Sequence, residues 1–448
     1  MLKEQLLAEV TKKYEDTYRK RTKKSLETLE VARKYMPGGD TRTSIWFEPY
    51  PFWIDKAEGC HFNDVDGNEY IDFHNCYSTM ILGHANPKVV AAVREQAARG
   101  TALGALVPAV VHWSELVCNM VDSVDKVRFS NSGTEGVMMA IRLARGLSGK
   151  DMLLRTDGGY HGSYDDVVCP PDATGLRKSN PSDSIIVPYN DKEAAGKAIV
   201  ENKDKLAAVI VEGAIGSAGM IPPRDGYLEH LRKVTEENDV FFILDEVISL
   251  RCAWGGTQAI YGVKPDLTTM GKIIGGGYPV GATGGREDLM QMFSPKTRKV
   301  YHSGTFNANP MTAVAGVATL EQLDANVIDY INRLGNSFAD GVRAIFKKLN
   351  IKGQVTGIGS LQNVHFSDQP IINGKTAREA NKELLHLYYL GMLERGCFSA
   401  ARGLYAMSTP MTQKEVDTAV KAVDDLMTEL KPTIEEIWPE LIGPAPEA

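Results

Sequence analysis

The distribution of apolar and polar residues divides the chain into parts with different periodicities. In residues 1–35 apolar side chains recur at helical spacing, which predicts one amphipathic helix that ends at the sequence MPGG. The following segment, residues 51–73, alternates apolar and polar positions on both sides of an Asp66-Gly67 pair. This arrangement is typical of a β-hairpin, so the N-terminal part is expected to hold a helix and antiparallel strands.

From about residue 87 short apolar runs alternate with longer amphipathic segments. Runs such as AAVIV and FFIL lack polar alternation, which is typical of strands covered on both faces. The alternation predicts an α/β fold with a mostly parallel central sheet and helices on both faces. Past residue 310 the pattern is helical to about residue 349, strand-rich over residues 352–367, and helical again to residue 437.

These changes of pattern predict three regions along the chain. Residues 86–325 are expected to form a large domain around the central sheet. Residues 1–85 and 326–448 are expected to combine into a small α+β lobe, so that both chain ends build one unit.

Composition and charge narrow the class of protein. The chain has 448 residues, of which 43% are hydrophobic and 24% charged, and its formal net charge is −7. These values indicate a globular protein without a nucleic-acid partner. The N-terminal segment lacks the apolar core of a signal peptide, and no stretch approaches the roughly 18 apolar residues of a membrane span. We therefore expect a cytoplasmic protein with no membrane partner.

The six cysteines form no CxxC pair and lie in apolar or loop contexts, so free thiols are expected rather than disulfides or a metal site.

Lys272 stands in the stretch DLTTMGKIIGGGYPVGATGG, between a short β-like run and a cluster of glycines. A lysine in this position could bind a phosphate or take part in covalent chemistry. The Walker pattern G-x-x-x-x-G-K-[ST] does not fit, because isoleucine follows Lys272, and GGGYPVG does not keep the Rossmann spacing. Most lysines are solvated, so the interpretation depends on the motifs that accompany this one.

Three other motifs follow strands of the predicted sheet. The sequence NSGTEG contains Ser132, Gly133 and Thr134 and opens a helix, where free N–H groups can bind a phosphate; a plain helix cap is the alternative. Asp245 ends the apolar run FFIL and either pairs with a cation or caps the next helix. Tyr160, in GGYHG, adds an aromatic ring.

Together these residues match the requirements of pyridoxal 5′-phosphate. Its phosphate needs N–H and hydroxyl donors, its ring needs a flat apolar environment, its pyridine nitrogen needs a carboxylate, and its aldehyde needs a lysine. The sequence therefore predicts this cofactor, with Lys272 as the covalent lysine and the glycines after it as packing and turn residues.

The chain also resembles a known family, the class III aminotransferases of pyridoxal-phosphate fold type I. The resemblance is to the branch that holds glutamate-1-semialdehyde aminomutases and β-amino-acid aminotransferases, and it runs from YMPGGDTR to RGLYAMS. It rests on NSGTEG, GGYHG, ILDEVI, DLTTMGKIIGGGYPVGATGG and HSGTFNANP, which stand in the family's order.

The resemblance implies a role for each matching residue. Lys272 would form the Schiff base and carry protons, and Asp245 would pair with the pyridinium nitrogen. Tyr160 and Val247 would pack on opposite ring faces, while Ser132, Gly133 and Thr134 would hold the phosphate. Thr305 would reach the cofactor of a neighbouring subunit, which implies a homodimer with shared active sites.

The segment MPGGDTRTSIWF departs from the aminomutase pattern, V-N-S-P-V-R-A-F after the two glycines. In an ungapped alignment the serine of that pattern falls on Arg42, and its carboxylate-binding arginine falls on Ile45. An arginine at position 42, and Arg402 in AARGLYAMS, resemble the β-amino-acid aminotransferases, where such an arginine binds the substrate carboxylate. The alternatives for Arg42 are an exposed arginine, or an arginine paired with Asp40 or Glu48.

A cluster of aromatic residues beside Arg42 also has two interpretations. It can be core packing of the small lobe, or it can form an apolar wall for a substrate side chain. The cluster consists of Trp46, Phe47, Tyr50 and Trp53.

Three functions follow from these observations. The first is transfer of an amino group from a carboxylate-bearing amine, a β-amino acid, to an oxo acid such as 2-oxoglutarate or pyruvate. The second is an isomerase on the same fold, either a glutamate-1-semialdehyde-type aminomutase or an amino-acid racemase. The third, a non-catalytic binding protein, is disfavoured because Lys272, Asp245 and the phosphate-binding motif occur together.

Overall fold

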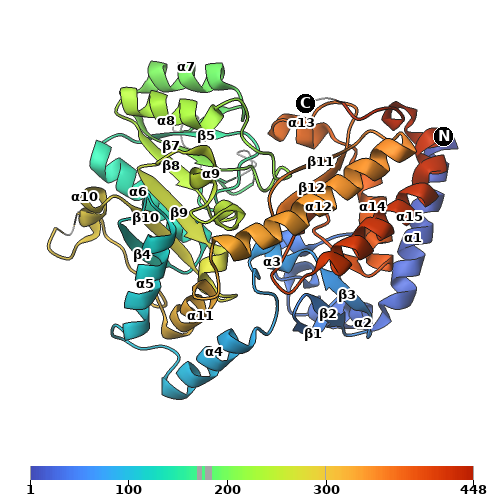
Figure 1. Cartoon of the computed structure of the whole chain (residues 1–448), viewed down its shortest axis with the longest axis horizontal. Helices are drawn as coiled ribbons and strands as arrows, with labels where there is room; N and C mark the ends of the chain where they lie inside the picture. The colour runs from blue at the N-terminus through green and yellow to red at the C-terminus, as the bar shows by residue number, and fades with distance from the viewer. Residues whose placement is uncertain (1, 169–173, 177–183, 298, 447–448) are drawn as a thin grey trace.

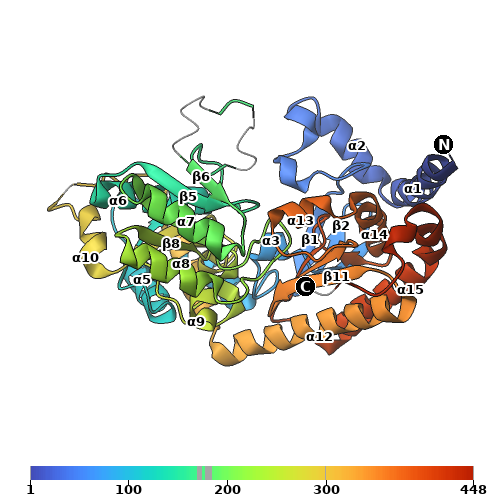
Figure 2. The same cartoon turned by 90° about the horizontal axis from the view of Figure 1, so that it is seen from above.

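The structure, a computed structural model, describes residues 2–168, 174–176, 184–297 and 299–446. It consists of a lobe built around the central sheet and a second lobe that carries both chain termini (Figure 1). The long helix α12 (Ala325–Leu349) runs from the sheet lobe across the second lobe. Figure 2 shows the same division from above, with α12 along one edge of the molecule.

The central sheet has seven strands in the order β4-β10-β9-β8-β7-β5-β6. The neighbours from β9 to β6 are parallel, whereas β10 is antiparallel to both β4 and β9. The predicted α/β fold with a mostly parallel sheet is therefore confirmed. The strands are β4 (Lys126–Ser130), β5 (Met152–Thr156), β6 (Ser184–Val187), β7 (Leu206–Glu212), β8 (Phe241–Asp245), β9 (Leu267–Gly271) and β10 (Gly281–Gly285).

Helices cover both faces of this sheet, as the apolar runs predict. Alternate residues of β7 point to opposite sides. Ala208 and Ile210 pack in the same cluster as α6 (Gly133–Ser148), whereas Val209 and Val211 pack with α7 (Lys192–Asn202) and α8 (Tyr227–Glu237). The remaining helices of this part are α4 (Pro87–Arg99), α5 (Pro108–Met120), α9 (Thr257–Tyr261), α10 (Glu287–Met290) and α11 (Pro310–Leu320).

The structure confirms the prediction that the glycines after Lys272 are packing and turn residues, and it places some of them in strand β10. Gly276 and Gly277 form a turn with positive φ, whereas Gly281–Gly285 is a fully buried strand. Its glycines allow a close approach: a Cβ on Gly281 would lie 1.7 Å from the carbonyl oxygen of Ser132. The glycine-rich strand thus lets the first turn of α6 lie directly against the sheet.

The second lobe joins the two chain ends through a shared sheet. Strand β13 (Cys397–Phe398) pairs in parallel with β3 (Glu69–Asp72), which forms the predicted hairpin with β2 (His61–Asp64). The boundaries proposed at residues 85 and 325 remain predictions. The lobe also contains β1 (Ile54–Glu58), the antiparallel strands β11 (Gly353–Ile358), β12 (Leu361–Phe366) and β14 (Leu404–Ala406), and helices α13 (Gly374–Glu379), α14 (Lys382–Glu394) and α15 (Gln413–Ile437).

The single N-terminal helix predicted for residues 1–35 is wrong, because the structure has two helices there. Helix α1 (Leu2–Arg21) ends just before Thr22. Helix α2 (Lys23–Ala32) begins just after it, beside the hairpin turn. The Asp66 carboxylate accepts hydrogen bonds from the backbone N–H groups of Lys24 and Ser25, at 2.6 and 3.0 Å. A carboxylate at the first turn of a helix stabilises a new N-terminus, which explains the break.

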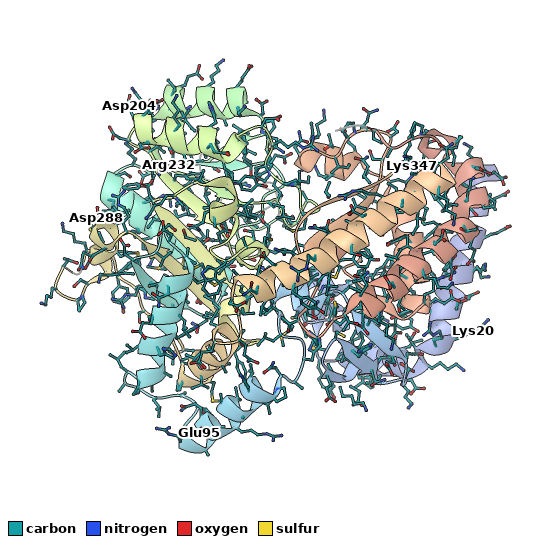
Figure 3. All side chains as sticks on the ribbon, in the orientation of Figure 1. Lys20, Glu95, Asp204, Arg232, Asp288 and Lys347 are labelled. Atoms are coloured by element: carbon teal, nitrogen blue, oxygen red, sulfur yellow. The ribbon has the colours of Figure 1, made fainter. Side chains whose placement is uncertain are left out.

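Charged side chains such as Lys20, Glu95 and Asp204 lie on the outside of the molecule (Figure 3). Among the described residues no helix is long and apolar enough to cross a membrane. Five cysteines are free thiols, and Cys169 lies outside the described residues.

The contact of Gly281 with α6 can be tested by Gly281→Ala. The added methyl would displace the first turn of α6, because overfilling a packed interior costs about 1–3 kcal/mol. We expect that loss of unfolding free energy in a urea titration. The control is Gly104→Ala, at an exposed glycine whose Cβ would meet nothing within 4 Å; equal stability of the two variants would contradict the proposed contact.

Candidate active site

The central residues of the site lie at the carboxyl ends of three adjacent strands. Glu212 is the last residue of β7, Asp245 is the last residue of β8, and Lys272 directly follows β9. Because parallel strands end at the same edge of a sheet, the three side chains come together although they are far apart in sequence. They line one cavity of about 510 Å³, together with Ser132, Gly133, Thr134, Tyr160, Val247, Arg42 and Arg402.

Asp245 is buried and fixed on both oxygens. Its Oδ2 lies 2.7 Å from Nδ1 of His161, and its Oδ1 accepts a hydrogen bond of 3.1 Å from the backbone N–H of Val247. The other ring nitrogen of His161, Nε2, is buried and has no hydrogen-bond partner among the described residues. His161 therefore orients the Asp245 carboxylate. No role was predicted for His161 from the sequence.

The electrostatics of the cavity disfavour charge. Burial lowers the pKa of Lys272, while the carboxylates of Asp245 and Glu212 act in the opposite direction. Burial also raises the pKa of Glu212 to about 7, although its oxygens accept hydrogen bonds from the backbone N–H groups of Tyr160 and Gly216 at 2.8 and 3.0 Å. A lysine with a lowered pKa is unprotonated more often at neutral pH, and is then available as a base and nucleophile.

The first turn of α6 forms the other end of the cavity. Ser132 is the N-cap of this 16-residue helix, and its hydroxyl accepts a 3.2 Å hydrogen bond from the N–H of Glu135. The helix-cap interpretation of NSGTEG is therefore confirmed. Phosphate binding remains a prediction that the cap does not oppose, because a capped helix still presents its first N–H groups to the cavity. Gly162 lies close to this turn, since a Cβ there would approach Thr134 Oγ1 to 2.3 Å.

The residues expected on the two ring faces also line the cavity. Val247 packs against Gly133, where an added Cβ would lie 3.1 Å from the valine side chain. Residue Tyr160 is 51% exposed. Thr305 is exposed and does not line the cavity of its own chain. Its predicted contact with a neighbouring subunit remains a prediction.

Arg42 and Arg402 approach the same tyrosine from opposite ends of the sequence. Their guanidinium carbons lie 5.9 and 5.5 Å from the centre of the Tyr77 ring. Arg42 is exposed, and no ion pair joins it to Asp40 or Glu48 in the described structure. Burial lowers the pKa of Arg402.

A second cavity of about 610 Å³ shares Arg42, Tyr77 and Arg402 with the first. The aromatic cluster predicted from the sequence divides here, because Tyr50 is buried in the core whereas the other three members line the cavity. We refer to this space as the aromatic chamber; its walls include Trp46, Phe47, Phe52, Trp53, Tyr389 and Phe398.

Sequence analysis did not identify Tyr77, which belongs to an unusual turn. The segment α3 (Asn75–Ser78) has positive φ at four successive non-glycine residues, 48°, 48°, 55° and 69°. The left-handed conformation costs about 1–2 kcal/mol for each such residue. Strain of this kind persists where surrounding contacts hold it, often at functional sites.

Comparison with known proteins identifies the family. Residues 44–409 match the family described as Aminotransferase class-III. The chain belongs to the class-III aminotransferase family. Members bind pyridoxal phosphate, so this chain is a pyridoxal-phosphate-dependent enzyme, as its sequence predicts.

Individual relatives carry different names. The glutamate-1-semialdehyde 2,1-aminomutase of Methanocaldococcus jannaschii is 41% identical over 91% of this chain and 99% of its own. A β-phenylalanine aminotransferase from Variovorax paradoxus has a TM-score of 0.92 at 31% identity, covering 99% of this chain and 100% of its own. An omega-transaminase from Sphaerobacter thermophilus has a TM-score of 0.85 at 35% identity, covering 90% and 97%.

The cavity of this class-III enzyme fits pyridoxal phosphate. The first turn of α6 suits the phosphate, Asp245 can face the pyridine nitrogen, and Lys272 can reach an aldehyde. The unpartnered Nε2 of buried His161 is a further polar group that a ligand or water can satisfy.

The raised pKa of Glu212 predicts a pH-dependent stability. A folded pKa of about 7 against an ordinary 4.5 means that the stability from protonated Glu212 is complete below pH 4.5 and is lost as the pH rises through 7. We expect the unfolding free energy to fall over this range by an amount on the order of 3 kcal/mol. Urea titrations without added cofactor measure it, because cofactor binding would add its own pH dependence.

Glu212→Gln should remove most of this slope, whereas Glu229→Gln, at an exposed glutamate, should leave it unchanged. A slope that survives in Glu212→Gln would assign the pH dependence to another group.

Proposed function

We propose that this enzyme transfers the amino group of a β-amino acid with a bulky apolar side chain to an oxo acid such as 2-oxoglutarate or pyruvate. One observation carries the proposal: Arg42 and Arg402 lie between the cofactor cavity and the aromatic chamber. A substrate amine at Lys272 would place its carboxylate near an arginine, which binds carboxylates through parallel hydrogen bonds. Its side chain would then enter the aromatic chamber.

The residues of the cavity divide the chemistry among them. Bound pyridoxal phosphate supplies an aldehyde that combines with the substrate amine and a ring that withdraws electrons. Lys272 Nζ can take the proton from the amine-bearing carbon and return it, since burial lowers its pKa. Asp245, oriented by His161, would pair with the ring nitrogen, and Tyr160 and Val247 would confine the ring between them. Ser132, Gly133 and Thr134 would anchor the phosphate.

The subunit arrangement belongs to the same proposal. Thr305 would contact the cofactor phosphate of a second copy of the chain, in a homodimer with shared active sites. Its loop is held beside the phosphate-binding turn by a 2.7 Å hydrogen bond from Asn131 Nδ2 to Asn307 Oδ1. In the same loop region Tyr301 and Phe306 are 78% and 56% exposed, which suits a surface that another subunit covers.

The aminomutase names of curated relatives that are 41% and 38% identical favour a second candidate, an isomerase that moves the amine within one substrate. A glutamate derivative has a short polar side chain and would fill little of the aromatic chamber. The geometry therefore favours the transaminase, whereas overall sequence similarity favours the isomerase.

The two candidates differ in their need for an acceptor, which a direct assay can measure. We expect a β-amino acid with an aryl side chain to yield glutamate from 2-oxoglutarate, or alanine from pyruvate, in a 1:1 ratio to the donor consumed. Lys272→Ala is the inactive control. If the enzyme instead moves the amine of glutamate-1-semialdehyde from C2 to C1 without acceptor and transfers none from β-amino acids, the proposal is wrong.

Arg42→Ala tests the carboxylate site. Losing a charged partner costs about 2 kcal/mol or more, which is roughly a 30-fold increase in KM for a β-amino acid. An arylalkylamine without a carboxylate should be affected only a few-fold, and Arg99→Ala, at an exposed arginine outside both cavities, should affect neither donor. Equal losses for both donors would move carboxylate binding to Arg402.

A further inference from the structure

The left-handed turn Asn75–Ser78 is held from two sides by charged residues. At its entry the Asp72 carboxylate accepts hydrogen bonds from the N–H groups of His74 and Asn75, at 2.9 and 2.8 Å. At its exit the guanidinium of Arg251 donates a 2.8 Å hydrogen bond to the carbonyl oxygen of Ser78. Charge-assisted hydrogen bonds at both ends therefore hold the turn in a left-handed conformation that non-glycine residues avoid.

Arg251 connects three distant parts of the chain. It lies in a short 3₁₀ turn, Ser249–Cys252, just beyond strand β8 and Asp245. Besides the Ser78 carbonyl, it donates to the carbonyl oxygen of Met407 and, at 3.2 Å, to the hydroxyl of Ser360. The turn is thereby attached to the end of the strand that carries Asp245.

The surroundings of Arg251 are unusual for a cation. Its side chain is 0% exposed, and no ion pair with a carboxylate is recorded for it within the described residues. Burial lowers its pKa to about 10. A charge solvated only by neutral oxygens is expensive to bury, so packing alone does not explain an arginine here.

The turn determines where the ring of Tyr77 lies. Tyr77 is the third residue of the turn, and its hydroxyl donates a 2.5 Å hydrogen bond to the carbonyl oxygen of Ser44. Ser44 is two residues from Arg42. Tyr77 therefore acts on Arg42 twice: its ring lies beside the guanidinium, and its hydroxyl fixes the backbone nearby. A shift of the turn would move the boundary between the cofactor cavity and the aromatic chamber.

We propose that Arg251 is a positioning residue of the substrate site. By holding the left-handed turn Asn75–Ser78, it keeps Tyr77 between Arg42 and Arg402 in the arrangement that binds a carboxylate. The carboxylate part of this inference rests on the proposed function, whereas the attachment of the turn does not.

The attachment is tested by thermal unfolding of the holoenzyme and the cofactor-free protein, with no substrate present. Ser78→Gly should raise the melting temperature, because glycine accepts positive φ freely and the Ser78 hydroxyl is buried without a partner in the described structure. Asn350→Gly is the matched control, at an exposed left-handed residue (φ 57°) that ends α12. It too should raise the melting temperature.

Arg251→Met should lower the melting temperature, and the decrease should be smaller in the Ser78→Gly background than in the Asn350→Gly background. Additive shifts in both backgrounds would overturn the attachment. If Arg251→Met does not fold, the same comparison is made with Arg251→Lys, which keeps the charge but has one donor group for two carbonyls.

The positioning role is tested by measuring KM and kcat separately for the Arg251 variants, with donors that have or lack a carboxylate. Arg251→Met should raise KM for a carboxylate-bearing donor by about tenfold or more, with a smaller change in kcat and in KM for an arylalkylamine. Arg251→Lys should recover part of the loss, and Asn350→Gly should change neither constant. Equal effects on both donors would reduce Arg251 to a structural residue.

Failure of the proposed function gives a different result. A wild-type enzyme that transfers no amino group from β-amino acids would defeat that function, yet the melting-temperature comparison would still stand. The KM comparison would then use glutamate-1-semialdehyde, which also carries a carboxylate.

Discussion

The partial burial of Lys272 at the wall of the cavity is the constraint on which the rest of the site depends. A lysine in a low-dielectric cavity loses its proton more easily, which suits it for chemistry at neutral pH but destabilises its charged form. The carboxylates of Asp245 and Glu212 offset part of that loss, and each must itself be stabilised in the interior. Asp245 has His161 and a backbone N–H, whereas Glu212 has two backbone N–H groups and keeps a raised pKa.

The sheet topology makes this concentration of charge possible. Strands β7, β8 and β9 are adjacent and parallel, so three short sequence motifs deliver their polar ends to one edge while their apolar residues stay in the core. Strand β10 contributes no polar side chain to the cavity lining. Its glycines leave room for the first turn of α6 to lie against the sheet. The lysine, the two acids and the helix end consequently occupy one compact cavity.

This geometry explains why half of the site could be predicted from the sequence. Lys272, Asp245, Tyr160, Val247 and the Ser132–Thr134 turn all stand at ends of recognisable strands or helices, and they do line one cavity. Their roles toward the cofactor remain expectations, but their assembly follows from strand order alone.

The other half could not be predicted, because it depends on contacts between distant segments. Nothing in the letters NCYS signals a left-handed turn, since glycine is the usual marker of positive φ. Arg251 carries no motif either, because its acceptors are mainly backbone carbonyls of residues 78 and 407. The break at Thr22 has the same origin: the cap on α2 comes from Asp66, in the next hairpin.

The same division separates the residues expected to hold the cofactor from those proposed to bind the substrate. Asp245, Lys272 and the first turn of α6, which are expected to hold the cofactor, stand at the ends of strands β8 and β9 and at the start of a helix. Arg42, Tyr77, Arg402 and the aromatic chamber, which we propose to bind the substrate, come instead from loops and turns of both chain ends. If the proposed function holds, the substrate carboxylate is selected by two arginines around one tyrosine, whose turn is held by a buried third arginine.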